Sequence, residues 1–150
     1  MTTSRQYTSR RFLIVEALVA KLKEINGTGA YSVDLAGNVE PRILFWDEIN
    51  EFPAVHVTAG AEQRVYQGGG YKDRFLSVTV RCYVKSEDAI AELEGLLGDI
   101  EFVIEENGRL AYQDRLGLQT THDIVVTNID TDEGVLAPLG VGEILLQVRY

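Results

Sequence analysis

The chain has 150 residues, of which 45% are hydrophobic and 25% are charged, as expected for one soluble globular domain. Its formal net charge of −9 argues against a protein that coats nucleic acid, because binding to phosphates needs clustered lysine and arginine. A single cysteine, Cys82, excludes an internal disulfide, so the fold does not depend on an oxidising compartment.

The N-terminal segment 1–11 is polar and basic, and the apolar stretch that follows it is interrupted by Glu16. That stretch is too short to cross a membrane and lacks a cleavage site with small residues, so we predict neither a transmembrane helix nor a signal peptide. We expect the protein in the cytoplasm or in a particle assembled there, with no membrane partner.

Residues 8–25 are predicted to form the first helix. Its apolar residues recur at steps of three and four, as on one face of a helix: Ile14, Leu18, Leu22 and Ile25. The Asn-Gly pair at 26–27 marks its end, because both residues tolerate a left-handed backbone.

A glycine-rich connection at 27–29 leads to short extended stretches predicted near 31–35 and 38–45. The aromatic residues in segments 46–48 and 52–53 indicate an ordered loop. Residues 54–58 then alternate as in a β-strand, which places Val55 and Val57 on one face and His56 on the opposite, solvent-facing side.

A long β-hairpin is predicted from strands at 62–67 and 71–85, joined by the turn Gly68-Gly69-Gly70. The second strand alternates strictly, and its apolar face comprises Leu76, Val78, Val80, Cys82 and Val84. The part near the glycines has few apolar residues to pack, so we expect the hairpin to project from its own domain.

The second helix is predicted to begin after Ser86, a candidate N-cap, and to end at the Asn-Gly pair 107–108. Its predicted buried face comprises Ile90, Leu93, Leu97, Ile100 and Ile104, with Leu96 and Val103 beside them. A loop is expected at 109–119. Two final strands are expected at 121–130 and 141–150, separated by turn residues at 132–134.

This order of elements predicts an α+β fold, namely a two-layer sandwich in which two helices cover one face of a mainly antiparallel sheet and a β-hairpin projects. No internal repeat or linker divides the chain, so residues 1–150 are expected to form a single domain.

No catalytic, cofactor or metal site is predicted. His56 and His122 lack further ligands at metal spacing and are interpreted as solvent-facing strand residues, and Cys82 as a buried, inert thiol. The glycines at 27, 68–70 and 140–142 lack the context of a phosphate-binding loop and are interpreted as turns. The acidic run 130–134 lacks the spacing of a calcium loop and is interpreted as an acidic turn.

Three parts of the chain carry a resemblance to a known family. They are the segment EFPAVHV from Glu51 to Val57, the projecting hairpin around residues 68–70, and the closing segments 134–138 and 142–144. Together with an opening helix near the N-terminus, these features resemble the tail terminator, or tail completion, proteins of long-tailed bacteriophages.

The resemblance implies a structural virion protein and no enzymatic activity or cofactor. Such a protein forms a hexameric ring on the last ring of the tail tube, ends its polymerisation and contacts the head–tail connector. The implied partners are copies of the chain itself, the major tail tube protein and the connector, while DNA passes through the lumen without specific binding.

The hairpin supplies a candidate interface with a neighbouring subunit or the tube, because it carries tyrosines and basic residues in an otherwise acidic protein: Arg64, Tyr66, Tyr71, Lys72 and Arg74. Three alternatives remain open from the sequence. They are a head–tail connector or neck protein, a cytoplasmic ligand-binding α+β domain, and an enzyme.

Overall fold

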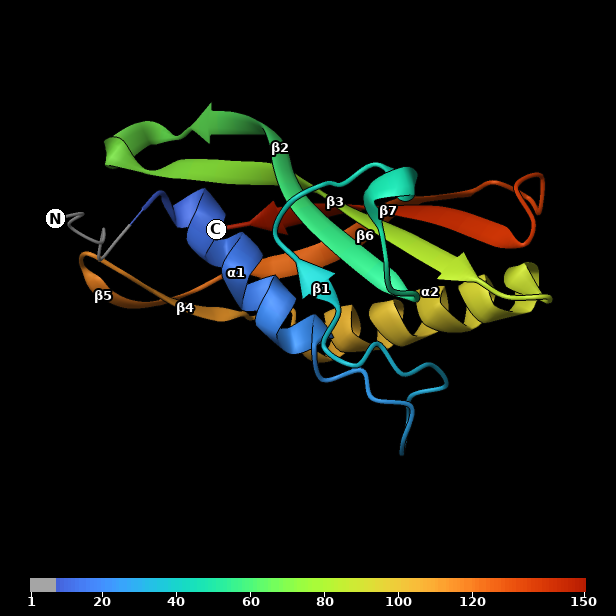
Figure 1. The fold of residues 1–150 in the computed structure, drawn as a ribbon. Helices are drawn as coiled ribbons and strands as arrows, with labels where there is room; N and C mark the ends of the chain where they lie inside the picture. Colours follow the sequence, from blue (N-terminus) through green and yellow to red (C-terminus); the bar gives the residue numbers. More distant parts are fainter. Residues whose placement is uncertain (1–7) are drawn as a thin grey trace, which may run out of the picture.

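The computed structural model describes residues 8–150 (Figure 1). In chain order its elements are α1 (Arg10–Leu22), β1 (Val39–Glu40), η1 (Trp46–Glu48), β2 (Ala54–Tyr66), η2 (Gly68–Gly70), β3 (Lys72–Lys85), α2 (Ala89–Glu106), β4 (Ala111–Asp114), β5 (Gly117–Thr120), β6 (Asp123–Thr131) and β7 (Leu139–Arg149). Neither helix in this described part of the chain is long and apolar enough to cross a membrane.

The main sheet has the strand order β1-β2-β3-β7-β6. β1 runs parallel to β2, and every other neighbouring pair is antiparallel. Both helices lie on the same side of this sheet (Figure 1). The predicted α+β sandwich with a mainly antiparallel sheet is therefore confirmed.

The hydrophobic core lies between the sheet and the helices. Val57, Val80 and Ile144 are register partners across β2, β3 and β7, and all three side chains are fully buried. Side chains of both helices pack against the sheet and complete the core, among them Leu18, Leu22, Leu96 and Ile100. Full burial of each such side chain contributes about 1.5–3 kcal/mol.

The limits of the helices differ from the prediction. The Ser9 side chain accepts a hydrogen bond from Phe12 N and caps α1, which ends at Leu22, whereas buried Ile25 belongs to the turn that follows. Asp88, and not Ser86, caps α2 by accepting from Ala91 N. The prediction that Ile90 is buried was wrong, because this first-turn side chain is 57% exposed.

The segment between α1 and β1 is held to α2 by a buried carboxylate. Asp99 accepts hydrogen bonds from the backbone amides of Ser32, at 3.0 Å, and Val33, at 2.9 Å, and from the Ser32 hydroxyl. A buried carboxylate is tolerated only when such donors replace its hydration. Asp99 therefore fixes a connection that has little secondary structure of its own.

Two glycines predicted as turns lie inside a strand. Gly140 and Gly142 belong to β7, where α2 packs closely against the sheet. A Cβ at Gly142 would lie 3.1 Å from Leu93 Cδ1 of α2, and one at Gly140 would lie 3.3 Å from Ala89 O of α2 and 2.7 Å from Val84 Cγ2 of the neighbouring strand. These glycines therefore provide a close approach between layers, and the turn interpretation of 140–142 was wrong.

The loop between β1 and β2 covers part of the sheet face that points away from the helices. Leu44 N donates to His56 Nδ1, and Tyr83 Oη donates to Leu44 O. His56 is only 2% exposed as a result, so its prediction as a solvent-facing residue was wrong, whereas His122 is exposed as predicted.

The strands predicted at 54–58 and 62–67 are one strand, β2, with an irregularity between them. The register with β3 shifts between Ala59 and Glu62, which leaves Gly60 and Ala61 as a bulge. A bulge bends its strand and increases the local twist. Residues 60–74 form the hairpin that begins at this bulge, and we call this hairpin the arm. Its residues 64–74 extend past the end of β7 (Figure 1).

Candidate assembly interface

The arm brings the five predicted interface residues together. Arg64 pairs with Arg74 and Tyr66 with Lys72 in the antiparallel register, so these four side chains share one face of the arm. Tyr71 follows directly after the turn η2. Whether this surface meets a neighbouring subunit or the tube stays a prediction.

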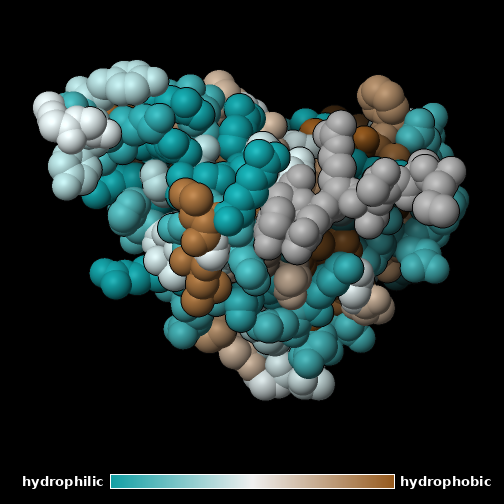
Figure 2. Space-filling model, turned by 90° about the vertical axis from the view of Figure 1, so that its left-hand side faces the viewer, coloured by the Kyte–Doolittle hydropathy of each residue, from teal (hydrophilic) through white to brown (hydrophobic). Residues whose placement is uncertain are grey.

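The outer end of the arm is the part with free side chains. Tyr66 is 71% and Tyr71 75% exposed, and Lys72 Nζ lies 5.8 Å from the centre of the Tyr66 ring. We call Tyr66, Tyr71 and Lys72 the arm tip. The lobe that projects at the upper left of Figure 2 consists of hydrophilic and neutral side chains, in agreement with this composition.

The two arginines are engaged within the chain, which we did not predict from the sequence. Arg64 Nε lies 2.5 Å from Glu62 Oε2, and the Arg74 guanidinium carbon lies 5.3 Å from the centre of the Tyr150 ring. At the base of the arm, the charge of Arg64 is therefore paired with a carboxylate, and the charge of Arg74 lies against an aromatic ring. Lys72 supplies the positive charge of the arm tip.

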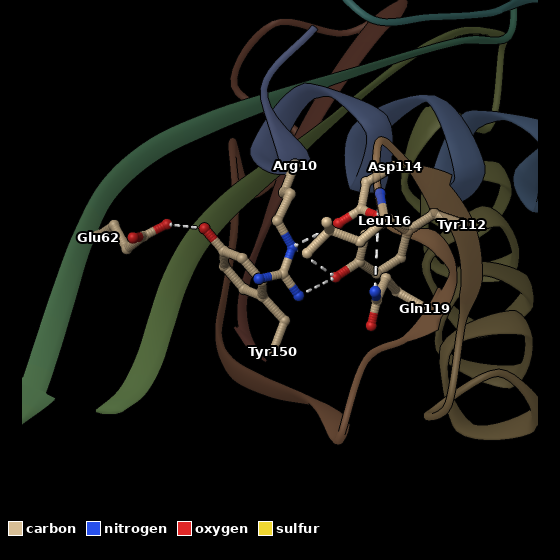
Figure 3. A network of polar contacts seen from close by, with 7 residues as sticks. All are labelled: Arg10, Glu62, Tyr112, Asp114, Leu116, Gln119 and Tyr150. Carbon is tan, nitrogen blue, oxygen red and sulfur yellow. Dashed lines mark hydrogen bonds and ion pairs between the residues drawn. The ribbon is translucent and has the colours of Figure 1, made fainter. Parts of the chain in front are cut away.

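A cluster of polar contacts, which we call the latch, joins the base of the arm to the body (Figure 3). Tyr150 Oη donates to Glu62 of β2, and the face of the Tyr150 ring lies 5.0 Å from the Arg10 guanidinium carbon. Arg10 in turn donates to Tyr112 Oη at 2.7 Å and lies 3.4 Å from Asp114 Oδ2. The latch therefore connects α1, β2, β4 and residue 150.

The electrostatics of the latch favour a charged Glu62 beside a neutral Tyr150. Burial acts to raise the pKa of Glu62, but hydrogen bonds from Tyr150 and Arg64 outweigh burial and hold this pKa below its ordinary value. Burial and the neighbouring Glu62 together raise the pKa of Tyr150. A second tie is the hydrogen bond from the Arg11 side chain to Gly60 O in the bulge.

The β4–β5 hairpin was missed by the sequence analysis, which predicted a loop at 109–119. Asp114 accepts from Leu116 N at 2.8 Å and so closes the turn. Leu116 and Leu118 are 88% and 75% exposed at the same end of the molecule as the arm. The strands were hard to recognise because each has only four residues and alternates weakly in polarity.

The residues that could have carried chemistry are poorly placed for it. Burial raises the pKa of Cys82 to about 12, which confirms the prediction of a buried thiol and leaves no thiolate at neutral pH. Burial lowers the pKa of His56, whose Nδ1 already accepts a hydrogen bond. Between residues 8 and 150, no three His, Cys, Asp or Glu side chains are arranged to hold a metal ion.

The acidic run at 130–134 was predicted as a turn, and the prediction holds for residues 132–134, whereas Asp130 and Thr131 are the last residues of β6. The Asp132 carboxylate accepts hydrogen bonds from Leu136 N at 3.1 Å and from Val141 N at 3.2 Å. Both oxygens of the carboxylate thus accept from the backbone and order the turn. Asp132 therefore has a structural role in the connection between β6 and β7.

Comparison with known proteins agrees with this description. Residues 8–150 match the family described as "Bacteriophage Tail Tube Terminator Protein". The tail tube terminator protein p142 of Escherichia phage T5 is 36% identical over 149 residues, which cover 93% of this chain and 92% of p142. A chain in the virion of a native gene transfer agent particle shares the fold, with a TM-score of 0.57 and 12% identity over 91% of this chain and 96% of that one. The chain belongs to the bacteriophage tail tube terminator family.

Proposed function

We propose that this virion tail protein forms a ring on the end of the tail tube, where it stops polymerisation and presents a surface to the head–tail connector. Membership in the tail tube terminator family supports the role at the end of the tube. The observation that carries the ring is the arm, a two-stranded hairpin that extends beyond the body with exposed tyrosines at its tip. A ring of six copies is the expectation from the family resemblance.

The arm is suited to contact another protein. An isolated two-stranded hairpin gains little stability in water, because it has no layer packed against it. Tyrosine buries a large area at low cost in side-chain entropy and retains a hydroxyl for a hydrogen bond. We propose that the arm tip becomes covered in the assembled tail.

The role requires binding and no reaction. A subunit in a closed ring needs two different complementary surfaces, since each copy meets one neighbour on each side. The tail tube protein and the connector would then bind the two rims of the ring. The net charge of −9 fits a lumen that lets DNA pass without specific binding, because acidic walls repel phosphates.

A paired variant of the arm tests this proposal. Tyr66→Ala with Lys72→Glu removes an aromatic contact and reverses the charge at the tip, and it leaves the Glu62–Arg64 pair intact. We expect circular dichroism to show an unchanged fold. In the presence of tail tubes, light scattering should detect no oligomer of the variant, and the tubes should exceed their normal length.

The matched control is Lys23→Glu with Glu105→Ala, which alters two exposed side chains on α1's C-cap and on α2. This control should form oligomers and cap tubes as the original protein does. Normal capping by the arm variant would remove the arm from the interface. A protein that stays monomeric in the presence of tail tubes, or that turns over a small molecule, would contradict the proposed function itself.

A further inference from the structure

The end of the molecule opposite the arm exposes apolar side chains. Here the connection between β6 and β7 lies against the first turn of α2 (Figure 1). Val135 is 82%, Ile90 57% and Leu136 48% exposed, and we call these three residues the turn patch. The turn that carries Val135 and Leu136 lies against Ile90, because a Cβ at the preceding residue, Gly134, would lie 2.8 Å from Ile90 Cδ1.

The turn patch is displayed on an ordered backbone. Besides accepting from Leu136 N and Val141 N with its side chain, Asp132 accepts from Val135 N with its carbonyl at 3.0 Å. Ser86 N donates to Pro138 O at 2.9 Å and ties the turn to the segment before α2. A surface that is already ordered loses little entropy on binding, which favours association.

Acidic side chains surround the turn patch. The exposed carboxylates at this end belong to Glu87 before α2, Glu94 in α2, Asp130 in β6 and Glu133 in the turn, and they outnumber the exposed Lys85 at the end of β3. An apolar centre with a charged rim is the usual composition of a protein–protein interface. The sign of the rim requires a partner that carries positive charge beside its apolar or aromatic groups.

The arm tip of a second copy meets this requirement. It offers two exposed aromatic rings and one lysine, and it lies at the other end of the same chain (Figure 1). A contact between opposite ends is head-to-tail, so it can repeat from copy to copy and close into a ring. Two copies facing each other through identical ends would instead bring like charges together.

We propose that the arm tip of each subunit docks on the turn patch of the next subunit in the ring. Tyr66 and Tyr71 cover Val135, Leu136 and Ile90, while Lys72 pairs with the acidic rim. This assignment rests on the proposed ring and adds the partner surface, which the sequence analysis left unnamed. It also explains why Ile90 is exposed on an otherwise buried helix stripe.

Disulfide trapping tests the assignment directly. Tyr71→Cys with Val135→Cys, in one chain, should give a ladder of covalent oligomers on mild oxidation in the presence of tail tubes. The native Cys82 does not interfere, because it is fully buried with a pKa of about 12. The comparison variant pairs Tyr71→Cys with Leu118→Cys, another exposed apolar position, and should give no ladder.

Mixing provides a second and independent measurement. The tip variant Tyr66→Ala with Lys72→Glu and the patch variant Val135→Glu with Leu136→Ser should each fail to form a ring alone. Mixed in equal amounts at high concentration they should give particles with the mass of two chains, because one intact tip and one intact patch remain. Glu133→Lys should weaken assembly by about tenfold, and Lys72→Glu in the same chain should restore it.

The outcomes separate this inference from the proposed function. If rings form and cap tubes but the 71–135 pair gives no ladder, or the 71–118 pair gives one, the assignment of the turn patch is wrong and the ring stands. If neither the original protein nor any variant forms a ring on tail tubes, the proposed function fails, and the assignment fails with it.

Discussion

The body and the arm are built from the same two strands, β2 and β3, yet they differ in what covers them. In the body, the helix side of β3 carries Leu76, Val78 and Val80, which are fully buried. In the arm, the same side carries Arg74, which is half-buried beside the Tyr150 ring, and Lys72, which is exposed. Continuous strands can therefore serve two purposes: the body stabilises the fold, and the arm displays side chains that its own chain does not bury.

The largest expected effect comes from shortening a core side chain at the border of the two regions. Leu76→Ala leaves a cavity beneath the helices and should lower the free energy of unfolding by about 3 kcal/mol. Tyr71→Ala, five residues away on the exposed arm, should change it by less than about 0.5 kcal/mol. Denaturant unfolding of both variants measures the contrast. An equal loss in both would mean that the arm is part of the core.

A smaller effect is expected from the buried carboxylate that fixes the connection after α1. Asp99→Ala removes the acceptor for Ser32 N and Val33 N and should cost about 2 kcal/mol, since these donors lose their partner. Glu105→Ala, at an exposed position of the same helix, serves as the control and should be neutral within about 0.5 kcal/mol. Stability of the Asp99 variant within that margin would show that the connection needs no anchor.

The body was largely predictable because its patterns are periodic. The apolar stripe of α2 and the strict alternation of β3 identify buried faces without any knowledge of their partners. Three glycines in a row likewise predicted the turn of the arm, and the alternation beyond it lacked the apolar residues that a covered strand needs. These features are local, and local chemistry determines them.

The errors arose where distant segments decide the environment. His56 fits an outward strand position, but the loop near Leu44 covers it. Gly142 looks like a turn residue, but α2 packs so closely against it that a side chain at this position would crowd Leu93. The β4–β5 hairpin depends on Arg10, about one hundred residues earlier, for part of its support.

The arrangement of the arm residues was predicted in part, whereas their role in an interface stays a prediction. The five residues do share one arm, as the alternation indicated, but their charges are not equivalent. Arg64 pairs with Glu62, two residues away on the same face, and this spacing was a signal that the sequence analysis overlooked. The turn patch was missed because helical periodicity placed Ile90 inside, although a first-turn residue can extend beyond the edge of the sheet.

The latch allows the border between body and arm to be weakened without removing a core side chain. Tyr150→Phe deletes the hydroxyl that donates to Glu62 and should cost about 1 kcal/mol. Hydrogen exchange should then accelerate at the arm amides and stay unchanged in α2. The pKa of Glu62 should rise, because one of the two hydrogen bonds that lower it is gone.

Acidification separates the latch from the rest of the body. Since the folded pKa of Glu62 lies below its unfolded value of 4.5, its contribution is present above that pH and is lost as the pH falls through the folded pKa. The difference in stability between Tyr150→Phe and the original protein should therefore shrink in acid. A difference that is independent of pH would assign the effect to packing of the ring.

The smallest effect concerns His56, on the covered far face of β2, where the body again differs from the exposed arm. Burial lowers the pKa of His56 below 6.5 in the folded protein, so the unfolded chain binds the proton first as the pH falls. The free energy of unfolding should thus be independent of His56 titration above pH 6.5, and it should decline below pH 6.5 until the folded pKa is reached. His56→Gln should remove this part of the pH dependence, whereas His122→Gln, at an exposed position, should leave it intact. Unfolding measured between about pH 7.5 and pH 5.5 distinguishes the two. If the free energy of unfolding changed equally with pH in both variants, the loop near Leu44 would open readily and leave His56 as hydrated as the side chains of the arm.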